Sequence, residues 1–260
     1  MNIILMSLIA GVAGMGLGGL LTALFGSKSD KMIGIFLSFS GGVMISIAFA
    51  ELIPEAINLS NTWIMVIGLF LGAALVFVLH TVIDNLSRVD GKSKLHETFA
   101  EFFHSGDMIS KKSGMLRSGM MMLFAIGLHN VPEGLAMGAA GNYDATLGLT
   151  LAIIIGLHNI PEGMAVSAPL MLGGLSKTKS VIITLIAGST TVLGAVIGVI
   201  IGSISNVAIA LSFGAAAGAM LYVVIGEILP QSIAMSKDHV PTIFAFLGIV
   251  IGMLFTEILH

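Results

Sequence analysis

LHNVPEG at residues 128–134 is followed by LHNIPEG at residues 157–163, and the architecture of the chain can be worked out from these two nearly identical stretches. In each copy the histidine and the glutamate are four residues apart, so they share one face of a helix. The proline between them cannot donate a backbone hydrogen bond and leaves a carbonyl of the preceding turn free. The repeat predicts two helices that carry the same polar cluster.

The chain around these polar clusters is strongly apolar. Of its 260 residues, 56% are hydrophobic and 10% are charged, with a mean hydropathy of +1.05. A soluble domain is only about half apolar and about a quarter charged. The composition therefore predicts an all-α integral protein of the cell membrane that crosses the lipid bilayer several times. A basic surface for nucleic acid is absent, and the lack of cysteine excludes disulfides and thiolate metal sites.

Hydropathy and helix breakers predict a single domain with eight membrane spans, because about 20 apolar residues cross a bilayer. The predicted spans are about 3–25, 32–57, 62–84, 114–140, 146–172, 180–202, 206–234 and 240–258. All eleven lysines and arginines lie in, or within a few residues of, connections from an odd-numbered span to the next even-numbered one. By the positive-inside rule these connections are cytoplasmic, including the long loop 85–113, and both termini lie outside.

A second, weaker repeat relates the two ends of the chain. AELIPEAI at residues 50–57 in span two and GEILPQSI at residues 226–233 in span seven both read Glu-x-x-Pro. Spans two and seven run in opposite directions, as spans four and five do. We therefore predict an inverted arrangement of three spans, a central pair and three spans, which is typical of secondary transporters with broken helices.

The central motif has the composition of a divalent-cation site. A lone ionised carboxylate inside a bilayer costs at least a few kcal/mol, and a bound cation would offset that cost. Imidazole and carboxylate ligands suit Zn²⁺, Fe²⁺ and Mn²⁺. Two helices facing each other would supply four such ligands, His129, Glu133, His158 and Glu162. The alternative is that the two prolines form a hinge pair with no metal.

These residues resemble the ZIP (Zrt-/Irt-like) metal-ion transporters of the prokaryotic type, over the whole chain. The resemblance implies uptake of Zn²⁺, and of related ions such as Cd²⁺, Fe²⁺ and Mn²⁺, into the cytoplasm. It implies a first metal site made by the four residues named above, and a second site beside it that is faced by Asn130 and Asn159 and bridged by the two glutamates. The expected partners are divalent ions, no resident cofactor is expected, and a homodimer is left open.

The chain departs from the family pattern in two places. Members with two metals carry a glutamate followed by a proline in span six, where this chain has Thr191 and Val192 in GSTTVLG, residues 188–194. Gly226 replaces a histidine that often precedes the glutamate of span seven. The resemblance therefore covers the ligands of the first site, whereas a span-six carboxylate for a second site is missing.

Further acidic and histidine residues suggest a path through the membrane. Glu51 and Glu55 lie in the outer half of span two and are predicted to act on the uptake side. Glu227, His80 and Asp84 lie toward the inner side and are predicted to act in release. Glu55 and Asp84 are also consistent with ordinary residues near span ends.

Three further interpretations concern a metal site in the long loop, a channel in place of a transporter, and an enzyme in place of a transporter. His96, Glu97, Glu101 and His104 could form a regulatory metal site in the loop, although the spacing of the nearby leucine and phenylalanines favours an amphipathic helix on the membrane surface. A selective cation channel would use the same ligands as a transporter. An intramembrane metalloenzyme is disfavoured, because neither Glu-x-x-His nor His-Glu-x-x-His occurs.

Overall fold

The described part of the chain consists of helices packed side by side as eight rods. The computed structural model describes residues 2–25, 30–86, 108–143, 145–200, 205–236 and 238–259. The first three rods are α1 (Ile3–Leu8) with η1 (Ile9–Ala13) and α2 (Gly14–Phe25), then α3 (Asp30–Ile47) with η3 (Ala48–Leu52) and α4 (Ile53–Leu59), then α5 (Thr62–Leu86). The others are α7 (Met108–Tyr143), α8 (Ala145–Leu172), α9 (Lys177–Ile200), α10 (Asn206–Val223) with η4 (Val224–Ile228) and α11 (Leu229–Ser236), and α12 (Val240–Leu259).

The helices are those of a membrane protein, as the composition predicts. Within the described residues no strand occurs, and six helical segments are long and apolar enough to cross a bilayer. A seventh segment, Thr62–Val78, is apolar but shorter. α7 already begins at Met108, inside the segment predicted to be a loop. A helix satisfies its own backbone groups, so it can continue past the edge of the apolar layer without a break.

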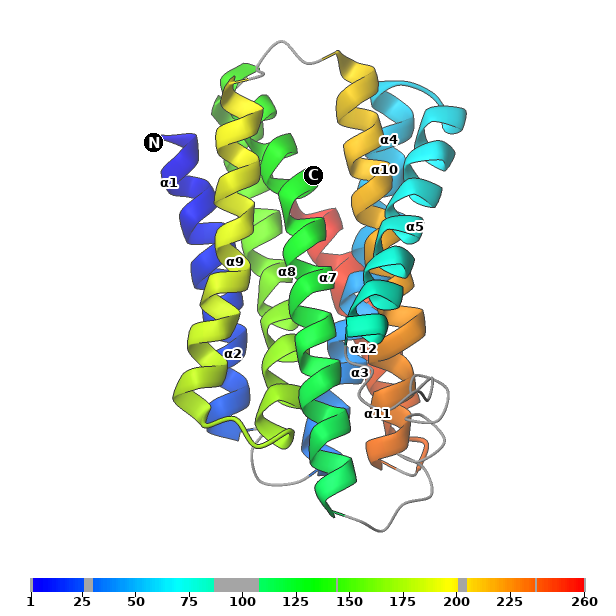
Figure 1. The fold of residues 1–260 in the computed structure, drawn as a ribbon. Helices are drawn as coiled ribbons and strands as arrows, with labels where there is room; N and C mark the ends of the chain where they lie inside the picture. The colour runs from blue at the N-terminus through cyan, green and yellow to red at the C-terminus, as the bar shows by residue number, and fades with distance from the viewer. Residues whose placement is uncertain are drawn as a thin grey trace.

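The rods alternate in direction, so their ends gather at two opposite ends of the molecule. Figure 1 shows α4 turning into α5 at the top, where the upper ends of α9 and α10 and both chain termini also lie, while α2 and α11 finish at the bottom. The bottom end therefore collects the connections that follow odd-numbered rods. These are the connections in which the sequence concentrates its lysines and arginines.

The contacts between rods repeat across the two halves of the chain. α2 packs on α8 as α9 packs on α7, α3 packs on α12 as α10 packs on α5, and α3 packs on α8 as α10 packs on α7. Exchanging the first three rods with the last three, and α7 with α8, reproduces each of these contacts. The chain is thus built as two inverted halves around the α7–α8 pair.

Glycine pairs allow the rods to approach to backbone contact at matching places. A β-carbon added at Gly163 would lie 2.1 Å from the Met15 carbonyl oxygen, and one added at Gly134 would lie 1.9 Å from the Thr191 carbonyl oxygen. Gly18 of α2 lies at the contact with Gly163, and Gly194 of α9 lies at the contact with Gly134. Gly18 and Gly194 are as many residues apart as Glu51 and Glu227, so they occupy equivalent positions in the two halves. Close approach through small residues is how membrane helices associate without a hydrophobic driving force.

Two turns of π-helix interrupt equivalent rods. η3 contains Glu51 and η4 contains Glu227, and in each case a proline follows in the first turn of the next helix, at Pro54 and Pro230. Proline is tolerated there because the first turn of a helix has no intrahelical partner for its N–H groups. π-helical turns are frequent at functional sites. The weak Glu-x-x-Pro repeat therefore marks two equivalent breaks in the fold.

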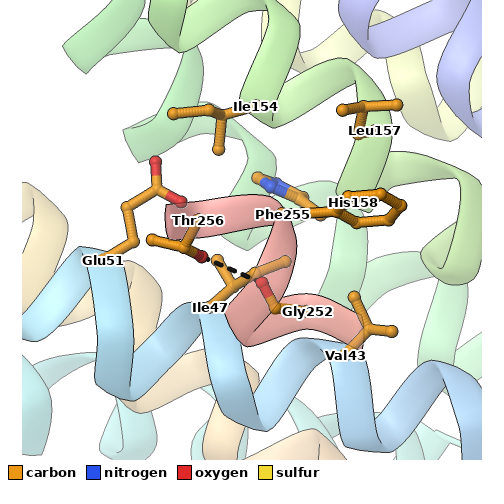
Figure 2. A pocket seen from close by; sticks show the side chains of 9 residues that line it. All are labelled: Val43, Ile47, Glu51, Ile154, Leu157, His158, Gly252, Phe255 and Thr256. Carbon is orange, nitrogen blue, oxygen red and sulfur yellow. Dashed lines mark hydrogen bonds between the residues drawn. The ribbon is translucent and has the colours of Figure 1, made fainter. Parts of the chain in front are cut away.

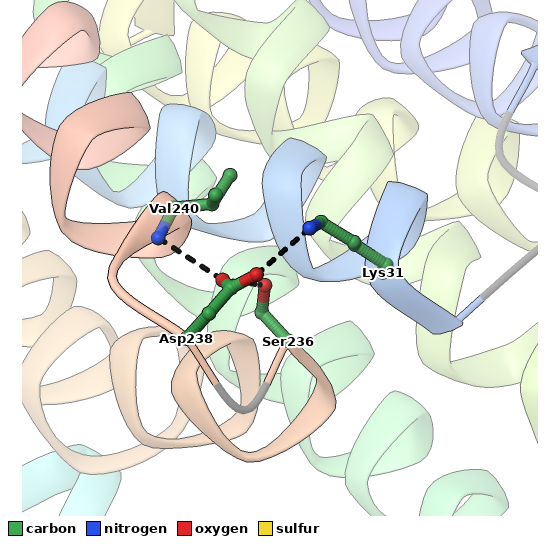
Figure 3. A network of polar contacts seen from close by, with 4 residues as sticks. All are labelled: Lys31, Ser236, Asp238 and Val240. Carbon is green, nitrogen blue, oxygen red and sulfur yellow. Dashed lines mark hydrogen bonds and ion pairs between the residues drawn. The ribbon is translucent and has the colours of Figure 1, made fainter.

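An ion pair links the start of α3 to the connection between α11 and α12. Lys31 Nζ lies 2.7 Å from Asp238 Oδ2, while Ser236 Oγ and the Val240 N–H donate to Asp238 Oδ1 at 2.6 and 3.1 Å (Figure 3). The hydrogen bond from Lys31, followed by that from Ser236, lowers the pKa of Asp238 to about 2. An exposed pair of this kind contributes little to stability. The ion pair holds the start of α3 beside the connection between α11 and α12, at one end of the molecule.

The glycine contacts make a prediction about stability. Gly218 and Gly226 lie in the same rod, but a β-carbon at Gly218 would lie 1.9 Å from the Leu69 carbonyl oxygen, whereas at Gly226 its nearest neighbour would be Tyr222 Cε1 at 3.9 Å. We expect Gly218→Ala to lower the free energy of unfolding by about 1–3 kcal/mol because the backbones must separate. Thermal unfolding in detergent measures this, with Gly226→Ala as the control that stays unchanged. Equal midpoints for the two variants would contradict the packing described above.

Candidate metal centre

Three ligand groups from α7 and α8 meet in the middle of the bundle. Glu133 from α7 and His158 and Glu162 from α8 each offer one atom, and these atoms lie within 4.8 Å of one another. The three side chains are 1%, 2% and 0% exposed. The two motifs come together because α7 and α8 are consecutive antiparallel helices that pack along their length. The cluster is therefore enclosed, and it is assembled from both copies of the repeat.

The electrostatics of this cluster favour a bound cation. His158 Nε2 lies 3.3 Å from Glu133 Oε2, and His158 Nδ1 has no hydrogen-bond partner among the described residues. Two carboxylates so close together repel each other when both are ionised, and burial removes the water that would screen them. A divalent cation would balance both charges and would use the imidazole as a neutral ligand. Nitrogen and carboxylate oxygen are ligands that zinc accepts.

Three neutral side chains with oxygen atoms are buried in the bundle, and two of them are the asparagines for which the resemblance implies a second site. Asn130, Asn159 and Thr191 are all fully buried. Asn159 Nδ2 donates to the Ala10 carbonyl at 3.1 Å, while Asn159 Oδ1 and Thr191 Oγ1 have no hydrogen-bond partner within the described part of the chain. The π-helical turn η1 makes that carbonyl accessible, because the Gly14 N–H bonds to the Ile9 and Gly11 carbonyls instead.

Glu51 lies beside the cluster, across a pocket that it shares with His158. Glu51 is 5% exposed, and its Oε2 atom has no hydrogen-bond partner among the described residues. Figure 2 shows Glu51 and His158 projecting into this pocket from different helices, with the side chains of α3, α8 and α12 lining it around them. The remaining lining residues are Val43, Ile47, Ile154, Leu157, Gly252, Phe255 and Thr256. A third carboxylate is thus held close to the three ligands.

The equivalent glutamate of the other half has a different environment. Glu227 is 3% exposed and accepts hydrogen bonds from Gln231 Nε2 at 3.0 Å and from Ser118 Oγ at 3.4 Å, and Gln231 also donates to Ser118. Gln231 occupies the place in the repeat that Glu55 has in the first half. Its position after Glu-x-x-Pro could have identified it, whereas nothing in the local sequence distinguishes Ser118.

For most of the other predicted site residues, the structure describes the backbone but not the side chain, or neither. Glu55 is half-buried in the first turn of α4. His129 lies in α7, and His80 and Asp84 lie in α5, but their side chains are outside the described part of the structure. The loop residues His96, Glu97, Glu101 and His104 also lie outside the described residues. The structure therefore brings together three of the four predicted ligands of the first site.

Comparisons with known proteins show which family the chain resembles over most of its length. A family model described as ZIP Zinc transporter matches residues 85–260. Over 98% of this chain and 95% of its own length, the zinc transporter ZupT of Akkermansia muciniphila is 32% identical. The ZupT proteins of Streptococcus mutans and Chlorobaculum parvum are 33% and 34% identical, over 92% and 96% of this chain and 89% and 92% of their own lengths.

These relatives carry the name of transporters, in agreement with the prediction of a transporter rather than an enzyme. Their similarity extends over nearly the whole chain. The inverted helical fold and the family match lead to the same conclusion: this chain belongs to the ZIP family of zinc transporters.

Proposed function

We propose that the chain moves Zn²⁺ and related divalent cations into the cytoplasm through the cluster between α7 and α8. The observation that carries this proposal is the meeting of Glu133, His158 and Glu162 within 4.8 Å, buried in a membrane bundle. Intramembrane ionisable residues mark ion pathways because their burial is otherwise unfavourable. The relatives are named zinc transporters, which supports zinc as the cargo.

Each ligand has a defined role in this proposal. Glu133 and Glu162 neutralise the ion, His158 supplies a neutral nitrogen, and His129 supplies the matching nitrogen from the other copy of the motif. Asn130 and Asn159 offer oxygens at the side of the ion. Zinc takes four nitrogen or oxygen ligands readily, so this set completes its coordination while the ion is shielded from water.

The path follows from the two buried glutamates at the π-helical turns. Glu51, with Glu55 one turn later, attracts the ion on the outer side and passes it across the shared pocket to His158. Glu227, followed by His80 and Asp84, receives it on the inner side. The orientation comes from the basic connections, which by the positive-inside rule face the cytoplasm.

A carrier fits the site better than an open channel. The three ligand side chains are at most 2% exposed, so an ion bound there would be enclosed on all sides. Release then requires the surrounding helices to move, as in alternating access between inverted halves. A carrier saturates at high metal concentration, whereas the flux of a channel continues to rise.

The first test removes the carboxylates. We expect Glu133→Ala and Glu162→Ala to abolish Zn²⁺ flux into liposomes and to weaken Zn²⁺ binding at least about 100-fold. The reason is that even the loss of a residue that only hydrogen-bonds to a metal ligand lowers metal affinity by about 10- to 100-fold. Glu257→Ala is the matched control, since Glu257 is an exposed acid on α12. Wild-type flux in a properly inserted double variant would rule out the central site.

The second test separates uptake from release. Glu51→Gln should raise the half-saturating Zn²⁺ concentration on the order of tenfold, which corresponds to about 1.4 kcal/mol of lost attraction. Glu227→Gln should instead lower the maximal flux and leave half-saturation nearly unchanged, because it acts after the central site. Stopped-flow uptake into liposomes loaded with a fluorescent chelator distinguishes the two parameters. If both variants changed the same parameter, the order of the path would be wrong.

The third test counts bound ions. Glu133 and Glu162 balance one divalent ion, and the remaining donors Asn130, Asn159 and Thr191 are neutral. Two divalent ions about 4 Å apart would repel by about 17 kcal/mol even at an effective dielectric of about 20. We therefore expect one tightly bound Zn²⁺ per chain by calorimetry. Two equally tight ions would mean that Glu51 closes inward as a third carboxylate ligand.

A further inference from the structure

The hydroxyl of Ser40 forms a hydrogen bond between α3 and the second motif. Ser40 is fully buried, and its Oγ donates to the carbonyl oxygen of Pro161 at 2.5 Å. The two residues are 121 positions apart in the chain. Pro161 is the proline of LHNIPEG, so this bond connects α3 directly to the backbone of the metal centre.

The other buried serines of α3 behave differently. Ser38 Oγ donates to the Ile35 carbonyl at 3.0 Å, and Ser46 Oγ donates to the Val43 carbonyl at 2.7 Å, both within their own helix. Ser40 also contacts the Met44 sulfur at 3.9 Å, but thioether sulfur is a weak acceptor. The hydroxyl of Ser40 is therefore directed across the helix interface, where it satisfies a backbone carbonyl of α8.

The bonded carbonyl has a particular place in the site. It belongs to the peptide unit that joins Pro161 to Glu162, and Glu162 is one of the three clustered ligands. The proline nitrogen of Pro161 donates no hydrogen bond to Leu157, so this turn of α8 lacks one of its normal restraints. A hydrogen bond from outside the helix holds the peptide unit, and with it the starting point of the Glu162 side chain.

The equivalent position in the opposite half has no hydroxyl to form this bond. Ser40 precedes Glu51 by eleven residues, and the residue that precedes Glu227 by eleven is Ala216. Alanine has no hydroxyl to donate, so α10 cannot hold α7 in the way that α3 holds α8. The two inverted halves are equivalent in their helix packing but differ at this interaction.

We propose that Ser40 is a positioning residue for the metal centre, which holds the LHNIPEG half of the site against α3 and acts through Glu162. This inference rests on the proposed function of the cluster as a Zn²⁺ site. Ser40 does not contact the ion. Its hydroxyl stabilises the arrangement in which the carboxylate of Glu162 lies within reach of Glu133 and His158.

The test compares Ser40→Ala with Ser38→Ala in purified protein, using ZnCl₂ as the probe. One buried hydrogen bond contributes about 0.5–1.5 kcal/mol, so Ser40→Ala should weaken Zn²⁺ binding in calorimetry by about 3- to 10-fold. The half-saturating concentration for liposome uptake should rise by the same factor, while the maximal flux does not fall. Ser38→Ala removes an equally buried hydroxyl that bonds within its own helix, and its binding should equal that of the wild type.

A second pair of variants tests the hydroxyl itself. Ser40→Thr and Ser40→Val have the same shape and differ only in the presence of a hydroxyl, so any effect of added volume cancels between them. We expect the threonine variant to bind Zn²⁺ at least about threefold more tightly than the valine variant. This comparison also decides the matter if Ser40→Ala does not fold.

The outcomes separate this inference from the proposed function. Equal Zn²⁺ affinity for wild type and Ser40→Ala, or for the threonine and valine variants, would overturn the role of Ser40. A lower unfolding midpoint of the metal-free Ser40→Ala protein with unchanged affinity would also overturn it, because that result indicates packing alone. Absence of Zn²⁺ binding and flux in the wild type would instead overturn the proposed function.

Discussion

The structure depends on the unfavourable energy of placing two carboxylates and an imidazole together in the apolar middle of a membrane bundle. Glu133, His158 and Glu162 are almost completely buried, with their ligand atoms within 4.8 Å. Like charges at this distance repel strongly where water is excluded. A proton on one carboxylate would relieve this repulsion, and a divalent ion between the ligands would balance both carboxylates at once. The site is therefore suited to hold an ion that later leaves.

The rest of the fold supports this cluster by bringing backbones close together and by breaking helices in chosen places. Glycines let α2 and α9 pack against α8 and α7 at the end of each motif, so the polar residues are enclosed. The π-helical turns place Glu51 and Glu227 at equivalent depths in the two halves. The equivalence is incomplete, because Glu227 accepts hydrogen bonds from Ser118 and Gln231 whereas Glu51 Oε2 faces a pocket without a described partner. In the path proposed above, that difference would give the two sides different affinities for a cation.

Much of the fold and of the candidate site could be predicted from local patterns. Apolar runs of membrane-spanning length predicted a helical membrane protein, and the four-residue spacing within each motif predicted that histidine and glutamate share a helix face. Asn130 and Asn159 were predicted to face a second site from the family resemblance, and that role stays a prediction. Ser40 and Ser118 were missed, since each bonds to a residue distant in the chain, whereas Gln231 was missed although it follows Glu227 by only one helical turn. Serine in an apolar helix most often bonds to its own backbone, as Ser38 and Ser46 do, so its identity alone carries no signal.

Composition and spacing within single helices were enough to predict that the chain is helical, that it lies in a membrane, and that each motif places a histidine and a glutamate on one helix face. Only the tertiary structure decided that Glu51 shares a pocket with His158, that Thr191 lies against η1 with its hydroxyl unpaired among the described residues, and that Ser40 bonds to Pro161. The physical reason is that these relations depend on how helices rotate and approach one another. Glycine contacts and π-helical turns set that rotation, and their effect is known only when the partner helix is in place.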